Sequence, residues 1–435
     1  MKNVLIIGAA GRDFHNFNVL YRNNEKEKVV AFTAAQIPGI ADRKYPPVLS
    51  GKLYPDGIPI LDEKDLTTII KKEKIDEAIL SYSDLSYVEV GNVAAKVLSA
   101  GADFKLIAPE KTMIKSSKKI IAVCAVRTGC GKSQTSRKIV SILTDAGKKV
   151  VAIRHPMPYG DLAEQAVQRF ATLEDLEKHK CTIEEREEYE QYVRMGAVIY
   201  SGVDYGKILE EAEKEADIIL WDGGNNDTPF YKPDLMITVV DPLRPGHEKT
   251  YYPGESNVYL SDVIVINKED SATEENIEKV VGNVLSINKN IKIIHADSKI
   301  TIENGEQIRN KMVIVVEDGP TLTHGGMSFG AGYQATKRYG GIAIDPRPFA
   351  IGSIKETYAK YPQSVNILPA MGYSLKQIKE LEETVNNSSA EFVVSGTPID
   401  LNLVMKINKP MLHANYELEE KGNLDLKSLL EEYMI

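Results

Sequence analysis

Short apolar runs alternate with amphipathic segments along the chain, and this alternation indicates an α/β protein. In the first third, four apolar runs predict strands, at Asn3–Ile7, Val29–Thr33, Lys74–Leu80 and Phe104–Ile107. Val88–Ala100 has helical periodicity instead. Strands separated by helices imply a parallel sheet with right-handed crossovers. We therefore predict a Rossmann-like N-terminal domain over residues 1–115.

A polar stretch with Pro109 places the domain boundary near residue 115. Residues 116–300 are expected to form a P-loop NTPase-type core around a parallel sheet. Its predicted strands are Ile120–Val126, Lys149–Arg154, Ile218–Trp221, Leu235–Val240, Val263–Ile266 and Ile291–His295. The highly charged segment at about 162–195 interrupts this series. It predicts one or two exposed helices, either a lid or a solvated structural pair.

Residues 301–435 form the predicted C-terminal α/β part. Its expected strands are Met312–Val316, Gly341–Ile344, Val365–Pro369, Phe392–Ser395 and Pro410–Ala414, with a helix at Leu375–Val385. This part is either a third domain or the far half of one large sheet. The pattern leaves both arrangements open.

Composition narrows the class of protein. The chain has 435 residues, 43% hydrophobic and 26% charged, with a net charge of −9. Such values predict a globular protein without a general nucleic-acid-binding surface. We find no apolar run long enough to span a membrane and no secretory signal, so a cytoplasmic protein is expected. Its three cysteines have neither a disulfide nor a metal-site spacing.

The strongest chemical signal is a glycine-rich turn between an apolar strand and a helix, at Arg127–Gln134. Backbone N–H groups of such a turn converge on phosphate, which predicts an ATP site. Lys132 would reach the β- and γ-phosphates, and the Ser133 hydroxyl would hold Mg²⁺. Val126 replaces the first glycine of the usual pattern. The expected nucleotide-contacting residues are Thr128, Gly129, Cys130, Gly131, Lys132, Ser133 and Gln134.

Two residues of this turn have further candidate roles. Arg127 would contact phosphates within the site or across a dimer interface, or it would satisfy a local carboxylate. A homodimer is natural if the interface role applies. Cys130 lies near a helix N-terminus, where the pKa of a thiol can be lowered and oxidation would block nucleotide binding. Alternatively, Cys130 is simply small enough to fit.

Two later strand ends complete the nucleotide-site prediction. Asp222 ends an apolar strand before two glycines, as in a Walker B element, and would bind Mg²⁺. Asp227 is a candidate for orienting a nucleophile. The run Asn267–Asp270 resembles the base-reading element of GTP-binding proteins, with Asn267 and Asp270 contacting the base. Related ATP-using ligases also keep an asparagine there, so the motif does not separate ATP from GTP.

Substrate contacts are expected from three other loops. In the loop after the second core strand, Arg154 and His155 would meet an anion and Asp161 would assist Mg²⁺. The stretch from Glu317 to Arg338 combines glycines, hydroxyls and basic residues, which predicts an anion nest. Its candidate contacts are His324, Lys337 and Arg338. The turn Gly8–Asp13 resembles a dinucleotide turn without the full glycine spacing, and Arg12 and Asp13 are candidates there.

Together, the turn Gly8–Asp13 and the motifs Arg127–Ser133, Trp221–Asp227, Asn267–Asp270 and Asp318–Arg338 resemble the archaeal cyclic 2,3-diphosphoglycerate synthetase family. The resemblance implies an ATP-dependent ligase that closes 2,3-diphosphoglycerate into a cyclic pyrophosphate and releases ADP and phosphate. It implies catalytic roles for Lys132, Arg127, Asp222 and Asp227, with Mg²⁺ on Ser133 and Asp222. The basic loop residues would hold the anionic substrate, and a histidine there would stay partly charged beside phosphates.

Two other functions compete with this one. A regulatory or maturation GTPase is indicated by Asn267–Asp270 and would show strong GTP preference. Alternatively, the N-terminal domain would be a sensor that gates an ATPase, with Arg12 and Asp13 altering regulation but not basal hydrolysis.

Overall fold

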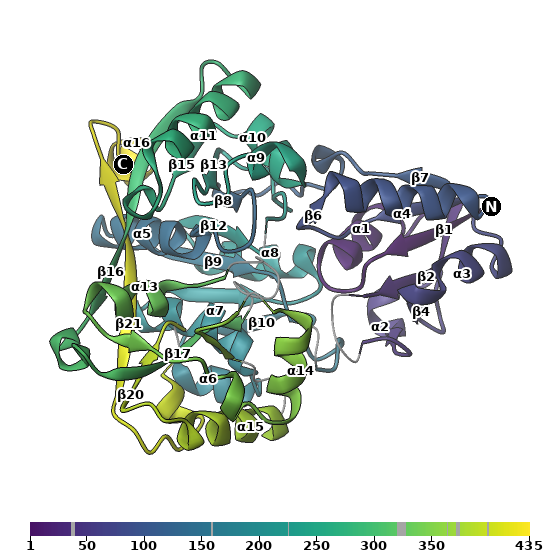
Figure 1. The fold of residues 1–435 in the computed structure, drawn as a ribbon. Helices are drawn as coiled ribbons and strands as arrows, with labels where there is room; N and C mark the ends of the chain where they lie inside the picture. Colours follow the sequence, from purple (N-terminus) through teal and green to yellow (C-terminus); the bar gives the residue numbers. More distant parts are fainter. Residues whose placement is uncertain are drawn as a thin grey trace.

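The N-terminal part is an open sheet of six strands in the order β3-β4-β2-β1-β5-β7 (Figure 1). A computed structural model describes residues 1–435 except 36–39, 158–159, 225, 320–327, 363, 371–374 and 398–399. The strands of this sheet are β1 (Lys2–Ile7), β2 (Glu27–Ala34), β3 (Lys44–Tyr45), β4 (Ile58–Asp62), β5 (Glu77–Leu80) and β7 (Asp103–Lys105). Its helices are α1 (Arg12–Leu20), α2 (Pro47–Ser50), α3 (Leu66–Lys72) and α4 (Tyr87–Ser99).

The pairings in this sheet are parallel except at its β3 edge. Sequence analysis missed β4 because Pro59 interrupts its short apolar run, and proline is unusual inside strands. The strand that follows β1 in the chain, β2, lies toward one edge of the sheet. The next strand of the sheet after β5, β7, lies at the opposite edge. Parallel sheets bind ligands beyond the carboxyl ends of strands at such a point.

The remaining chain forms one 13-stranded sheet. Its first strands are β8 (Lys119–Ala125), β9 (Val150–Arg154), β10 (Gln168–Phe170), β11 (Val198–Ser201), β12 (Ile218–Gly223), β13 (Leu235–Val240) and β15 (Val263–Ile266). Its later strands are β16 (Lys292–Ile302), β17 (Met312–Asp318), β18 (Ile342–Ala343), β19 (Leu368–Ala370), β20 (Phe392–Ser395) and β21 (Met411–Lys421). The C-terminal strands are therefore the far half of one large sheet.

Two long strands join the halves of this sheet. β16 and β21 pair antiparallel from His295↔Lys421 to Ile302↔Ala414. Both are longer than their apolar runs predicted, because outward-facing polar residues alternate with buried ones along β16. The helices that flank the sheet are α5 (Lys132–Asp145), α8 (Tyr205–Glu215), α9 (His247–Thr250), α10 (Gly254–Leu260), α11 (Glu274–Ile287), α13 (Ala331–Arg338), α14 (Gly352–Lys360), α15 (Leu375–Asn387) and α16 (Leu426–Met434).

The charged insertion contains strand β10 and helices α6 (Leu173–Lys178) and α7 (Ile183–Arg194). The prediction of exposed helices was wrong for α7. Tyr189 and Tyr192 are buried in the main hydrophobic core, and several glutamates of α7 are buried as well. Charged residues hid this buried face from the sequence pattern: Glu190 pairs with Arg186 and Arg194 of the same helix, and Glu188 reaches a distant strand, at Arg154.

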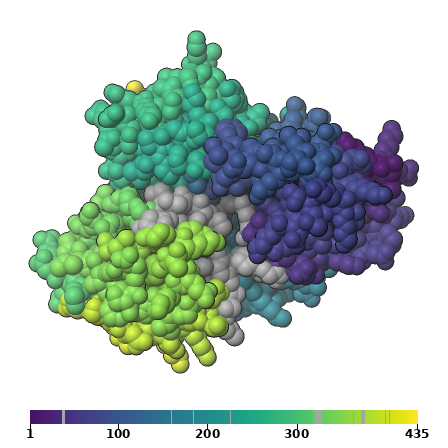
Figure 2. Space-filling view, turned by 45° about the vertical axis from the view of Figure 1, so that its right-hand side comes forward, coloured from purple at the N-terminus to yellow at the C-terminus, as the bar shows by residue number. Residues whose placement is uncertain are grey.

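The N-terminal part contacts the core directly. Strands β6 (Leu85–Ser86) and β14 (Tyr251–Tyr252) form a small antiparallel sheet between the two parts. The His15 ring of α1 stacks on Phe230 of the core, with ring centroids 4.1 Å apart. In Figure 2 the N-terminal part lies at the right, part of the core at the top and the C-terminal part at the lower left. None of the helices in the described ranges is long and apolar enough to cross a membrane.

Candidate active site

A cavity of about 270 Å³ lies where the N-terminal part, the core and the C-terminal strands meet. The loop after β1 and the residues Ser81–Ser83 after β5 line it from the N-terminal part. The turn between β8 and α5 lines it from the core, and Glu317 lines it from the end of β17. The cavity therefore lies beyond the carboxyl ends of strands of both sheets, where α/β proteins bind ligands.

The turn before α5 has the geometry of a phosphate cradle. Gly129 and Gly131 have φ values of 81° and 107°, which favour glycine. A Cβ atom at Gly131 would also collide with the Asn267 amide. Lys132 is the first residue of α5, and Thr128, Gly129, Lys132, Ser133 and Gln134 all line the cavity. Among the described residues, no carboxylate accepts from the N–H groups of Gly131, Lys132 or Ser133.

Asp222 is fully buried at the end of β12 and lies at the centre of an ionic cluster. Its Oδ1 accepts from Lys132 Nζ at 2.8 Å and from Ser136 Oγ at 2.6 Å. Its Oδ2 accepts from the Tyr192 hydroxyl at 2.8 Å and from Arg154. Burial raises the pKa of Asp222, but the charges of Arg154 and Lys132 outweigh it and hold that pKa below its ordinary value. Asp222 is therefore ionised and positions Lys132.

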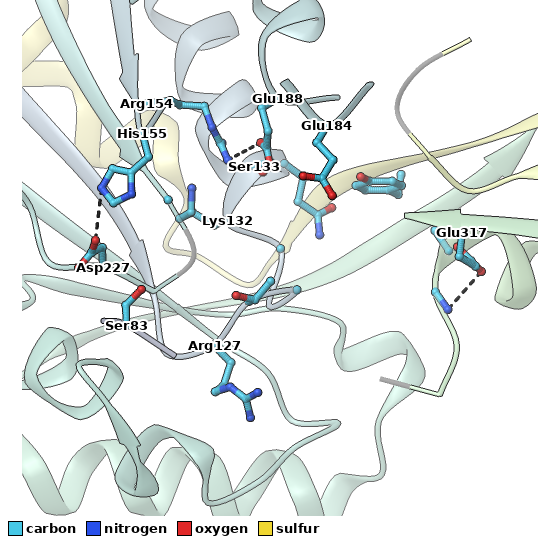
Figure 3. A pocket seen from close by; sticks show the side chains of 18 of the residues that line it. Ser83, Arg127, Lys132, Ser133, Arg154, His155, Glu184, Glu188, Asp227 and Glu317 are labelled. Carbon is cyan, nitrogen blue, oxygen red and sulfur yellow. Dashed lines mark hydrogen bonds and ion pairs between the residues drawn. The ribbon is translucent and has the colours of Figure 1, made fainter. Parts of the chain in front are cut away.

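Arg154 also pairs with Glu188 of α7, and Figure 3 shows this contact. Glu184 and Glu188 lie one helical turn apart on α7, and both line the cavity. Sequence analysis did not single out either glutamate. Their spacing of four residues places both on one face of a helix. It indicates a binding site only once Arg154 is known to lie opposite.

Arg127 satisfies a carboxylate of the N-terminal part in this structure. Its Nε donates to Asp84, its guanidinium lies 3.7 Å from the centroid of the Tyr251 ring, and His247 is 3.0 Å from its NH1. In Figure 3 its side chain points away from Lys132. Arg127 thus links the P-loop turn to the N-terminal part, and a role across a dimer interface stays a prediction.

Cys130 is buried and Arg244 donates to its Sγ. Burial raises the pKa of the Cys130 thiol to about 11. Of the two alternatives for Cys130, the lowered pKa is therefore wrong, because burial outweighs any effect of the nearby helix N-terminus. Its small size explains its place in the turn.

Arg12, Asp227 and His155 form a second buried group at the cavity. Arg12 donates to Asp227 Oδ1 and lies over the Phe230 ring. The Nε2 atom of His155 lies 3.3 Å from Asp227 Oδ2 (Figure 3). Burial lowers the pKa of His155 well below its ordinary value, and the charge of Arg12 lowers it further. His155 is therefore neutral among these protein groups, and a partly charged histidine beside phosphates stays a prediction.

Two other predicted anion sites are occupied by the protein's own carboxylates. Asp13 accepts from the backbone N–H groups of Ala10 and Phe14, both within 2.8 Å. Glu317, which is almost fully buried, accepts from the N–H groups of Gly330, Gly332 and Tyr333 at 2.7–3.2 Å. The turn after β1 and the start of α13 therefore already hold an anion.

Several predicted site residues lie outside the cavity. Asn267 donates to the Cys130 carbonyl and supports the turn from behind. Asp270 accepts from Ser298 N and pairs with Arg338, while Lys337 is exposed beside Tyr333. Asp161 is exposed and accepts from the N–H groups of Ala163 and Glu164. His324 is outside the described residues.

Comparison with known proteins places the chain among nucleotide-dependent synthetases. The CobW/HypB/UreG nucleotide-binding domain model matches residues 211–295. Arginine synthetase ArcE of Thermococcus kodakarensis is 61% identical over 99% of this chain and 97% of its own length. A cyclic 2,3-diphosphoglycerate synthetase of Thermococcus sibiricus is 24% identical over 50% of this chain and 54% of its own length. Among solved structures, LpxK of Aquifex aeolicus in complex with ATP has a TM-score of 0.45 at 12% identity, covering 80% of this chain and 97% of LpxK.

Proposed function

The chain belongs to the arginine synthetase ArcE family, and on that premise we propose that it forms arginine with ATP as the energy source. The observation that carries the proposal is 61% identity over nearly the whole chain. At the coarser level, the chain is an ATP-dependent ligase of the P-loop class.

Elementary chemistry narrows the reaction. Arginine differs from the ureido amino acid citrulline by a nitrogen in place of the ureido oxygen. ATP would phosphorylate that oxygen, and a nitrogen nucleophile would then displace phosphate. The terminal guanidino nitrogen carries only hydrogen, so ammonia is the simplest donor. The products are arginine, ADP and phosphate.

The cysteines support free ammonia as the donor. Releasing ammonia from an amide by covalent catalysis would need a reactive thiolate. Cys124 and Cys130 are buried, and burial raises the pKa of each thiol, to about 12 and about 11 respectively. Burial also raises the pKa of Cys181. None of the three has the properties of a nucleophile.

The P-loop turn is the proposed ATP site. Lys132 would neutralise the transferred phosphoryl group, and the free N–H groups of the turn would bind the phosphates. Mg²⁺ prefers hydroxyl, carboxylate and phosphate oxygens, which fits Ser133 and Glu188 at the cavity wall. Among the described residues no three His, Cys, Asp or Glu side chains gather to hold a metal alone. Asp222, whose oxygens already accept four donors, would act mainly by positioning Lys132.

The charges around the cavity favour a zwitterionic substrate over a strongly anionic one. The lining cations Arg12, Arg127, Lys132, Arg154 and Lys268 each have a carboxylate partner. Glu184, Glu188 and Glu317 add negative charge to the wall away from the N-terminal part. An α-ammonium group is attracted by such a wall, whereas two phosphates are repelled.

Cyclisation of 2,3-diphosphoglycerate is the second candidate, favoured by the partial match to the synthetase of that name. A GTPase function is the third, and it requires Asp270 to read guanine. Asp270 instead accepts from Ser298 and pairs with Arg338 outside the cavity. A competition experiment between ATP and GTP for the purified protein separates the last two, because only the GTPase would prefer GTP.

The decisive experiment compares two substrate sets. The purified protein is incubated with Mg-ATP and either citrulline plus ammonium or 2,3-diphosphoglycerate. ADP release is followed together with arginine by chromatography and cyclic pyrophosphate by phosphorus NMR. We expect arginine and ADP in equal amounts in the first mixture. If cyclic pyrophosphate forms from 2,3-diphosphoglycerate and no arginine forms from citrulline plus ammonium, the second candidate function replaces the first.

A further inference from the structure

His155 lines the cavity with one ring nitrogen beside a carboxylate. Its Nε2 is 3.3 Å from Asp227 Oδ2 without forming a hydrogen bond, and Arg12 donates to the other oxygen of that carboxylate. Aromatic rings fix the plane of the imidazole, with the centroids of Phe230 and Trp221 at 4.9 and 5.7 Å. A neutral imidazole with its proton on Nε2, the nitrogen beside this carboxylate, carries its lone pair on Nδ1. In that tautomer the ring can accept a proton at Nδ1.

Two glycines border the Nδ1 side of the ring. A Cβ atom at Gly11 would lie 3.1 Å from Nδ1, and one at Gly224 would lie 2.6 Å from it. Both glycines line the cavity. Gly11 has a φ of −144°, which other residues also adopt, so lack of space and not backbone conformation accounts for glycine there. The space beside Nδ1 is therefore narrow, and a side chain at either position would close it.

This space lies on the N-terminal side of the cavity. Gly11 follows β1, and Ser81–Ser83 follow β5, the two strands at which the chain turns toward opposite sheet edges. Lys132 and the P-loop turn lie on the core side. A phosphorylated substrate bound at Lys132 therefore has His155 and the N-terminal loops on one flank, and the acidic residues of α7 on the other.

We propose that His155 is the catalytic base that takes a proton from the nitrogen nucleophile, with Asp227 as its positioning residue. This inference rests on the proposed arginine synthesis. The lone pair of ammonia forms the bond to the ureido carbon, and the newly bonded nitrogen gives one proton to Nδ1. The bond from that carbon to the phosphorylated oxygen breaks, and phosphate leaves with the electron pair. The departing phosphate then takes the proton from Nδ1.

The test uses His155→Gln in the full chain. A general base contributes about 10²–10⁴-fold, so we expect kcat for arginine formation to fall by at least ~100-fold. Phosphoryl transfer to citrulline precedes the proton transfer and should survive. Citrulline-dependent exchange of bridging and non-bridging oxygen-18 in ATP should therefore stay within about threefold of wild type, as should the KM for ATP. His413→Gln, at a partly exposed histidine paired with Asp400, is the matched control and should leave every parameter unchanged.

A second variant guards against a folding defect. His155→Ala opens space beside Gly11 and Gly224, and added imidazole should restore arginine formation at least ~10-fold, which a purely structural role would not allow. Asp227→Asn should lower kcat less than His155→Gln does. Arginine formation within threefold of wild type in His155→Gln would overturn the inference, as would parallel loss of oxygen exchange. If the wild-type protein makes no arginine at all, the proposed function itself fails and the inference falls with it.

Discussion

Three glycine-containing turns between a strand and a helix face the cavity, and they differ in what occupies their N–H groups. The turn after β1 holds the carboxylate of Asp13, and the start of α13 holds that of Glu317. In the turn before α5, Asp84 accepts from Thr128 N at 3.4 Å, but among the described residues no carboxylate accepts from the N–H groups of Gly131, Lys132 or Ser133 at the helix start. All three share the sequence pattern of an anion site.

The difference shows what the pattern means physically. Converging N–H groups require a negative charge, but the protein itself can provide that charge. At the start of α5, Asp222 is bound to Lys132 and Arg154 and leaves the N–H groups there to a ligand. In the other two turns a carboxylate of the protein itself occupies the N–H groups. Substitutions in the turn before α5 should therefore change catalysis, and substitutions in the other two turns should change stability.

The largest expected effect is on catalysis at the P-loop turn. Lys132→Met removes the cation that would meet the transferred phosphoryl group, and ATP-dependent product formation should fall about 10²–10³-fold. ADP release in the presence of substrate measures this loss. Lys138→Met, an exposed change on the same helix paired with Glu420, is the control and should retain wild-type activity. An active Lys132 variant would remove the distinction between the three turns.

Glu317→Gln should affect stability more than nucleotide binding. The amide can accept fewer of the three N–H bonds, so urea unfolding should show a loss of about 1–3 kcal/mol. The KM for ATP should change less than twofold. Glu391→Gln offers a matched control, since that exposed carboxylate also accepts a backbone N–H, from Met312, and should leave the free energy of unfolding nearly unchanged. Unchanged stability with a collapse in ATP affinity would indicate that Glu317 belongs to the nucleotide site.

The pH dependence of stability should reveal the internal anion after β1. Burial raises the pKa of Asp13 to about 7, above its value of about 3.9 in an unfolded chain. The folded protein then binds more protons than the unfolded chain between about pH 4 and 7, so this group lowers stability as pH rises through that window. Asp13→Asn keeps a carbonyl acceptor but does not titrate. Between about pH 4 and 7 its Tm should therefore fall by about 2–4 °C less than that of the wild-type protein. An identical slope in the variant would contradict the assignment.

The smallest effect is expected at Cys130. Because burial raises the pKa of its thiol to about 11, alkylating reagents should not label it in the native protein at pH 8. Cys130→Ala should retain activity within about twofold. Mass spectrometry after iodoacetamide treatment checks the first point, and rapid labelling with loss of nucleotide binding would restore a redox role.

Local patterns predicted the α/β class and the strand–turn–helix around Arg127–Ser133, since apolar periodicity and a glycine-rich turn depend on neighbouring residues. They did not predict partners that the fold brings from far along the chain. The burial of α7 depends on Arg154 and Asp222, and Asp84 meets Arg127 only because β6 pairs with β14. Arg338 and Asp270 were both predicted as ligand contacts but bind one another. Such long-range pairs leave no local signal.

The most direct test of the central claim is incorporation of labelled nitrogen. The protein is incubated with Mg-ATP, citrulline and ¹⁵N-ammonium, and arginine is analysed by mass spectrometry while ADP is measured in parallel. We predict arginine with one ¹⁵N atom in its guanidino group, in equal amount to ADP, and none with the Lys132→Met variant. ADP formation without labelled arginine would contradict the proposed function.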